Sequence, residues 1–107
     1  GGAVVMSDFV PAVLRNLQAN AELNSIEART VWLDWAMEAG VASEDTSNAT
    51  WYAGDVSRAD IDAFARLKEE EKFDIIVGSD VCYESDHPEL VSAVIAKRLA
   101  PGPTVRP

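Results

Sequence analysis

Cysteine is nearly absent from this sequence, and long apolar runs are absent altogether. Cys82 is the only cysteine, which excludes an intrachain disulfide and a zinc site built from several cysteines of this chain, and we predict no metal site. No apolar stretch approaches the roughly 20 residues that a membrane-spanning helix requires, so we expect no membrane partner. Residues 1–5 have no basic segment before their apolar stretch. We therefore expect no signal peptide and a protein that is not secreted, located in the cytoplasm with the nucleus as the alternative.

Positive charge is scarce as well. Nine lysines and arginines stand against 18 aspartates and glutamates, which gives a formal net charge of −9. Such a chain does not neutralise a row of phosphates, so electrostatic binding to nucleic acid is excluded. An acidic surface fits a basic partner, such as a lysine-bearing protein, although solubility alone is the simpler interpretation. The length predicts a single domain, residues 1–107, with one core.

Short apolar segments alternate with helical patterns, which predicts an α/β fold. The predicted strands are residues 3–7, 30–33 and 73–79, a fourth begins at 104–105, and 40–57 is a predicted loop. Predicted helices begin near Val10, near Ser57 and at Asp86, and the last of them is expected to bury Leu90, Val91, Val94, Ile95 and Leu99. These strands are too apolar to face water. We therefore expect a parallel sheet that is covered by helices on both faces.

Each of the three clear strands is followed by an acid, at Asp8, Asp34 and Asp80. The carboxyl ends of parallel strands lie along one edge of a sheet, which is where open α/β sheets bind their ligands. A carboxylate in the position of Asp8 accepts hydrogen bonds from both hydroxyls of a ribose. The interpretation without a ligand is that Asp8 caps the helix that follows it.

The residues after the second and third predicted strands likewise have a ligand-binding interpretation and a purely structural one. Asp34 and Trp35 together offer an acceptor and a flat aromatic surface for an adenine ring, or they are a loop acid beside a packed indole. Ser79 is small enough for a ligand to approach the backbone closely. Asp80 would then orient an amine and Tyr83 would line its channel, or the two are a capping acid and a half-buried aromatic residue.

The remaining polar and aromatic candidates are assigned to structure. Trp32 lies within a strand pattern, so we expect it in the core. Cys82 has no base beside it, because His87 is the only histidine and is expected on the surface at a helix start. A cysteine nucleophile is therefore not predicted.

Four segments, in order, resemble one enzyme family. They are Val5-Met6-Ser7-Asp8 with the helix residues 14–20, the run Val31-Trp32-Leu33-Asp34-Trp35, residues 73–83 with their Asp-x-x-Tyr signature, and Leu99-Ala100-Pro101-Gly102. The family is methyltransferase family 16, within the class I S-adenosylmethionine-dependent methyltransferases, and it includes protein-lysine methyltransferases. The resemblance covers nearly the whole chain except residues 36–72, where the fit is loose.

The resemblance implies a fold, a cofactor and roles for the candidate residues. The fold would be a Rossmann-like sheet of seven strands, and the cofactor would be S-adenosylmethionine. The cofactor-binding residues would be Asp8 on the ribose, Trp35 with Asp34 on the adenine, and Ser79 through its backbone. Asp80 and Tyr83 would be the catalytic residues, shaping the site where a protein lysine meets the methyl group.

The chain also departs from the family pattern. The family's first strand and its glycine-rich loop would precede Gly1, and the family's last strands would follow Pro107. We therefore expect a fragment of a longer enzyme, and we expect the segment by itself to be marginally stable and inactive. Three alternatives stay open: a related enzyme whose acceptor is histidine, arginine or a small amine; a nucleotide-binding α/β module without catalysis; and a non-catalytic remnant that only interacts with other proteins.

Overall fold

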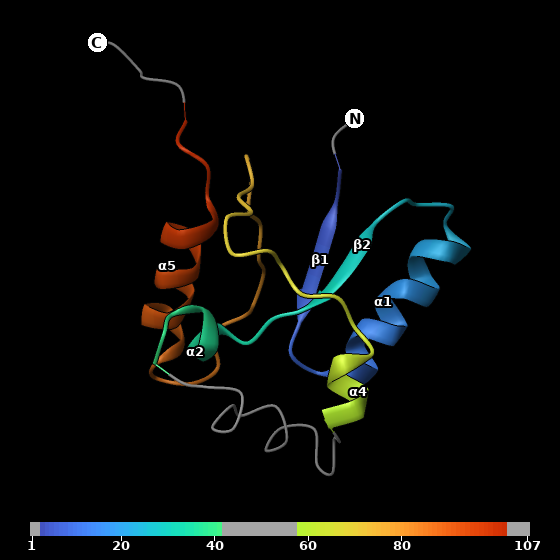
Figure 1. Ribbon diagram of the computed structural model, residues 1–107, viewed down its shortest axis with the longest axis horizontal. Helices are drawn as coiled ribbons and strands as arrows, with labels where there is room; N and C mark the ends of the chain where they lie inside the picture. Colours follow the sequence, from blue (N-terminus) through green and yellow to red (C-terminus); the bar gives the residue numbers. More distant parts are fainter. Residues whose placement is uncertain (1–2, 42–57, 103–107) are drawn as a thin grey trace.

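The computed structural model describes residues 3–41 and 58–102, which form a small mixed α/β unit with two parallel strands and four helices (Figure 1). In chain order the elements are β1 (Val5–Asp8), α1 (Pro11–Leu23), β2 (Arg29–Trp32), α2 (Trp35–Glu38), α4 (Arg58–Asp62) and α5 (His87–Arg98). The first two predicted strands and the helices beginning near Val10 and Asp86 are thereby confirmed. Residues 42–57 of the predicted loop, Ser57 among them, and the strand predicted at 104–105 lie outside the described residues.

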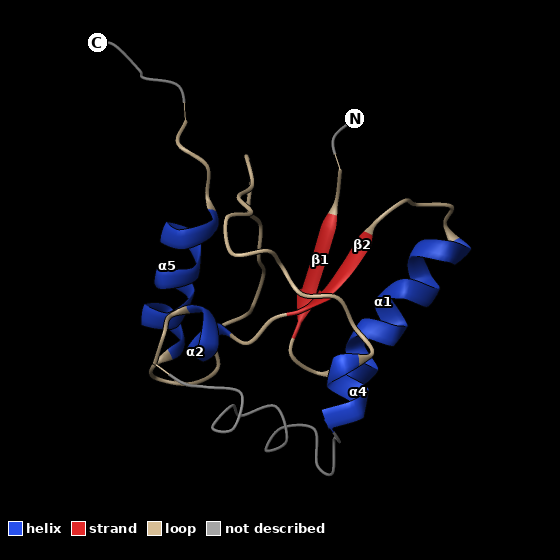
Figure 2. Ribbon diagram, viewed as in Figure 1, coloured by secondary structure: helices blue, strands red, loops and turns tan. Residues whose placement is uncertain are grey.

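Strands β1 and β2 pair in parallel, with Val5 opposite Arg29 and Asp8 opposite Trp32. Helix α1 makes the crossover between them and packs against both strands (Figure 2). Pro11 occupies the first turn of α1, where a missing N–H costs little, and Leu14 is fully buried one turn later. This strand–helix–strand unit is the part of the predicted α/β fold that the structure contains.

The core lies beside β2, between α1 and α4. It consists of the buried side chains of Leu14, Trp32, Ile61 and Phe64. The prediction that Trp32 is a core residue is confirmed, because it is 2% exposed and its indole Nε1 donates a hydrogen bond to the Phe9 carbonyl at 2.8 Å. This bond also fixes the turn that leaves β1.

A second packed region joins α2 to α5, and its centre is the side chain of Arg98. The guanidinium is 2% exposed and makes a two-pronged ion pair with Glu38, through Nε at 2.6 Å and Nη2 at 2.8 Å. Its Nη1 donates to the carbonyl oxygens of Lys68 and Glu71 at 2.6 and 3.0 Å. The hydrogen bonds to Glu38 raise the pKa of Arg98 above its usual value, although burial opposes the shift. Arg98 therefore ties α5, α2 and residues 68–71 together.

The buried face of α5 differs from the prediction. Val94 is buried and Leu90 and Val91 are half-buried, as expected, but Ile95 and Leu99 are 38% and 40% exposed. The buried position near the end of the helix belongs to Arg98 instead, because Glu38 and three backbone carbonyls satisfy its donors.

Another ion pair connects the start of β2 to residues 68–71. Arg29 binds Glu71, whose second oxygen accepts the Lys68 N–H at 3.2 Å. Burial raises the pKa of Glu71, but the hydrogen bonds from Lys68 and Arg29 and their positive charges outweigh it, so this pKa lies below its usual value. A carboxyl whose pKa is lower in the folded than in the unfolded chain stabilises the fold at pH values above its unfolded-state pKa. That stabilisation is lost as the pH falls through the folded-state pKa.

The third predicted strand is wrong in this structure. Residues 74–79 are irregular, and the side chains of Ile75 and Val77 are 79% and 89% exposed. Only Phe73 is paired, through its N–H to the Arg98 carbonyl at 2.7 Å and its carbonyl to the Ala100 N–H at 2.8 Å. A strand needs a neighbouring backbone for its polar groups and a layer for its apolar side chains. No strand of the described residues lies beside 74–79, so the predicted sheet, covered on both faces, is reduced to β1 and β2.

No helix among residues 3–41 and 58–102 is both long and apolar enough to span a bilayer.

Candidate functional site

Two of the predicted acids lie at the shared carboxyl edge of β1 and β2. The Asp8 carbonyl accepts the Leu33 N–H at 3.0 Å, which places Asp34 one residue beyond the end of the pairing. The prediction that Asp8 and Asp34 follow neighbouring parallel strands is therefore confirmed. Parallel pairing brings their two backbones together, although they are 26 positions apart in the sequence.

Asp8 is held in place by the turn between β1 and α1. Its Oδ1 accepts the N–H of Val10, the residue before α1, at 2.9 Å, and its side chain is half-buried. One carboxylate oxygen of Asp8 thus serves the capping role predicted for this residue. Within the described part of the chain no donor reaches Oδ2, so the fixed carboxylate keeps an acceptor for a ligand hydroxyl.

Asp34 caps α2. It is 6% exposed, and its Oδ1 accepts the N–H groups of Ala36 at 2.8 Å and Met37 at 3.3 Å. A carboxylate at a helix N-terminus satisfies backbone donors that have no partner within the helix. Because Trp35 is the first residue of α2, the cap also sets the direction of the indole relative to β2.

Replacing Asp34 with alanine is expected to lower the free energy of unfolding by about 1 kcal/mol, because two backbone N–H groups lose their acceptor. Urea denaturation of the chain followed by far-ultraviolet circular dichroism measures this loss. Asp34→Asn keeps an acceptor oxygen and is expected to lose less than half as much. Equal stability of the alanine variant and the parent would contradict the capping role.

His87 joins Trp35 to the loop that carries Tyr83. Its ring lies edge-on to the Trp35 ring, with the centroids 5.1 Å apart and the planes at 88°. Its Nδ1 accepts the backbone N–H groups of Tyr83 at 2.9 Å and Glu84 at 3.2 Å. The predicted helix start at His87 is confirmed, and the ring is half-buried, with Trp35 on one side and the two loop amides on the other. The sequence does not indicate the contact between His87 and Trp35, because the two residues begin two helices, α5 and α2, that are far apart along the chain.

The predicted catalytic residues lie on the irregular segment 74–86. Tyr83 is 78% exposed, and the side chains of Ser79 and Asp80 are exposed as well. Asp80 has a φ of 51°, a left-handed conformation that aspartate adopts more readily than most residues and that recurs at functional sites. No hydrogen bond or ion pair within the described residues joins Ser79 or Asp80 to the carboxyl edge of the sheet, so the site predicted at one edge is only partly assembled.

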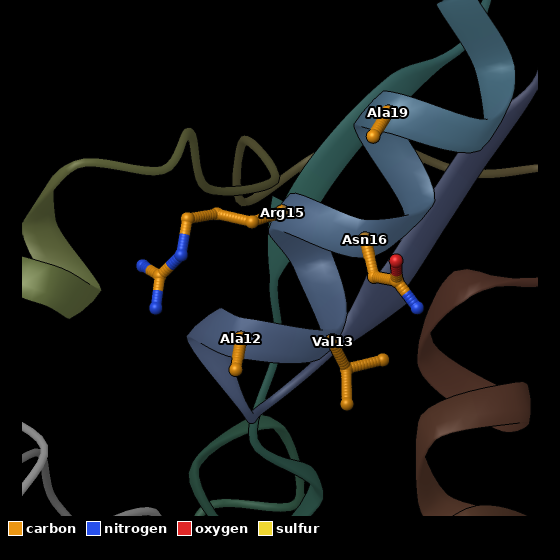
Figure 3. Close-up of a pocket in the computed structure, with 5 residues that line it drawn as sticks. All are labelled: Ala12, Val13, Arg15, Asn16 and Ala19. Atoms are coloured by element: carbon orange, nitrogen blue, oxygen red, sulfur yellow. The ribbon is translucent and has the colours of Figure 1, made fainter. Parts of the chain in front are cut away.

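Two hollows on the described part of the surface are small or open. One of about 160 Å³ lies beside Asp34, between β2, α2 and the segment after α4, and is lined by Trp32, Leu33, Asp34, Met37, Glu38, Arg66 and Leu67. This volume is below the roughly 300–1,000 Å³ that is typical of small-molecule sites. The second is a wide, open surface along α1, lined by Ala12, Val13, Arg15, Asn16 and Ala19 (Figure 3), and it contains none of the predicted site residues.

Residues 3–41 and 58–102 contain no group of three or more histidine, cysteine, aspartate or glutamate side chains arranged to hold a metal ion. Comparison of the chain with family models, with curated proteins and with solved structures found no match.

Proposed function

We propose that this chain is part of a longer enzyme that transfers a methyl group from S-adenosylmethionine to a side-chain amine of a protein, with lysine as the acceptor. The observation that carries the proposal is the edge where β1 and β2 end. Asp8 and the pair Asp34-Trp35 lie there on adjacent backbones, in the order that the resemblance to methyltransferase family 16 implies. The Rossmann-like sheet of that family belongs to the same proposal. In that sheet, strands from other segments of the enzyme would lie beside β1 and beside residues 74–79.

The roles of the cofactor-side residues follow from their contacts. Asp8 uses Oδ1 for the turn and presents Oδ2 to a ribose hydroxyl. Asp34 holds the start of α2 and leaves one carboxylate oxygen for the amino group of an adenine. Trp35, half-buried between β2 and α5, supplies aromatic surface for the adenine ring. A hollow of about 160 Å³ holds only part of such a ligand, so other segments of the enzyme must complete the pocket.

The acceptor side is formed by the exposed loop residues. Asp80 is an exposed carboxylate that attracts and orients an amine. Ser79, which precedes it, belongs to the cofactor side, because its small side chain leaves the backbone open to the cofactor. Tyr83 has most of its ring in solvent, so it is able to pack along the aliphatic part of a lysine side chain.

When bound, S-adenosylmethionine would supply an electrophilic methyl group on a positively charged sulfur, with a neutral thioether as the leaving group. The residues of this chain contribute by holding the amine and the methyl group in line. The acceptor nitrogen must be unprotonated when it attacks, and the methylated nitrogen then loses a proton to solvent. The formal charge of −9 favours the approach of a basic segment of the protein substrate.

A competition experiment separates this function from a nucleotide-binding module without catalysis. The complete enzyme is loaded with fluorescent S-adenosylhomocysteine, and unlabelled S-adenosylhomocysteine or a nicotinamide dinucleotide is added. We expect displacement by S-adenosylhomocysteine at a concentration at least about 100-fold lower, which corresponds to about 3 kcal/mol of selectivity. Equal displacement by the two ligands would favour the dinucleotide-binding alternative, because Asp8 serves a ribose in either case.

A further inference from the structure

The side chain of His87 touches both halves of the candidate site. On one side its ring packs edge-on against Trp35, at 5.1 Å between centroids. On the other side its Nδ1 accepts the N–H groups of Tyr83 and Glu84 at 2.9 and 3.2 Å. Trp35 follows β2, whereas Tyr83 belongs to the exposed loop before α5, so the two halves are distant in the sequence.

The hydrogen bonds of the loop that carries Tyr83 show why its connection to Trp35 through His87 matters. The Asp86 side chain makes no capping hydrogen bond at the start of α5, and His87 itself closes a turn through its N–H to the Glu84 carbonyl at 3.1 Å. The amides of Tyr83 and Glu84 belong to no helix or strand ladder. Their acceptor is the imidazole Nδ1 of His87.

We propose that His87 is a positioning residue for methyl transfer, which holds the loop with Tyr83 at a fixed place relative to Trp35. This inference rests on the proposed function, in which Trp35 contacts the adenine and Tyr83 lines the path of the lysine. A displacement of about 1 Å between two reacting groups is enough to slow a reaction about 100-fold. The two contacts of one rigid ring thus keep the acceptor side in register with the cofactor side.

Two substitutions separate the two contacts. Asparagine places its amide oxygen near the position of Nδ1 and keeps the acceptor, but it removes the ring from Trp35. Phenylalanine keeps a ring against Trp35 but removes the acceptor. Ala96→Ser, at an exposed position of α5, is the control on the same helix.

Amide hydrogen exchange of the complete enzyme without cofactor, followed by NMR, tests the contact independently of cofactor binding. We expect His87→Phe to speed exchange at Tyr83 and Glu84 by about tenfold, the equivalent of one lost hydrogen bond, and His87→Asn to leave it within about threefold of the parent. Ala96→Ser should change neither amide. The same exchange rates in the parent and in His87→Phe would overturn the proposal.

Steady-state kinetics of the complete enzyme test the positioning role. We expect His87→Phe to lower kcat about 10- to 100-fold with little change in the KM for S-adenosylmethionine, and His87→Asn to raise that KM more than it lowers kcat. A loss of stability alone would lower the amount of active enzyme in both variants without such a split. An active parent whose variants show no split overturns the inference, whereas a parent that transfers no methyl group overturns the proposed function and the positioning role with it.

Discussion

Replacing Asp8 with alanine is expected to weaken the binding of S-adenosylmethionine to the complete enzyme about 100-fold. The carboxylate is fixed by the Val10 N–H, and its Oδ2 has no partner among the described residues, so a ribose hydroxyl gains a strong acceptor that needs no reorganisation. A hydrogen bond to a charged oxygen contributes up to about 3 kcal/mol, which corresponds to about two orders of magnitude in Kd. Equilibrium dialysis or calorimetry measures this change.

Two further variants make the Asp8 experiment specific. Asp8→Asn keeps an acceptor for the Val10 N–H but loses the charge, so we expect intermediate binding and an unchanged fold. Glu27→Ala removes the same charge from an exposed position away from the carboxyl edge and is expected to bind like the parent. If Asp8→Ala folded normally and bound the cofactor within threefold of the parent, Asp8 would be only a capping residue.

Replacing Arg98 with methionine is expected to have the largest effect on stability, a loss of about 3 kcal/mol in the free energy of unfolding. The substitution leaves the Glu38 carboxylate, whose side chain is 14% exposed, without its two-pronged partner, and it leaves the carbonyls of residues 68–71 without their donor. An uncompensated buried charge is costly. Lys97 does not replace the arginine, because its Nζ is 4.0 Å from Glu38 and closer to Glu69, at 3.2 Å.

A double variant distinguishes a lost ion pair from lost packing. Arg98→Met combined with Glu38→Leu removes both charges, and we expect it to recover at least half of the loss in chemical denaturation. Because the pKa of Arg98 is raised, its stabilisation of the fold is present at every pH below its unfolded-state pKa and is lost only in strongly alkaline solution. The loss of stability in Arg98→Met should therefore be equal at pH 6 and pH 8. A loss below about 0.5 kcal/mol for the single variant would show that Arg98 does not hold α2 and α5 together.

The sequence predicted those elements whose apolar spacing reflects packing against segments that are close to them in the chain. Helix α1 and strands β1 and β2 form one continuous unit, in which Leu14 and Trp32 pack as their spacing indicates. The prediction for residues 73–79 failed because apolar composition shows that a segment is suited to burial but not which backbone pairs with it. Ile75 and Val77 have the composition of a core strand and are exposed here for want of a neighbouring strand.

The candidate site was predictable to the same extent. An acid directly after an apolar strand indicated Asp8 and Asp34, and parallel pairing brought them together. The roles of Arg98 and His87 were missed, because both depend on distant segments. Arg98 reaches Glu38 across 60 positions of the sequence, and an arginine in an amphipathic helix is ordinarily solvated. For His87 the decisive partners are two loop amides and an indole, and neither spacing nor composition encodes these contacts.

The most direct test of the account is methyl transfer by the complete enzyme to an array of peptides that each carry a single lysine, arginine or histidine, with labelled S-adenosylmethionine. We predict labelling of lysine peptides, at least about 100-fold weaker in the Asp8→Ala enzyme at limiting cofactor and unchanged in the Glu27→Ala enzyme. Labelling confined to arginine or histidine would keep the methyl transfer and change the acceptor. An enzyme that binds nucleotides but labels no peptide and no protein would contradict the central claim and favour a binding module without catalysis.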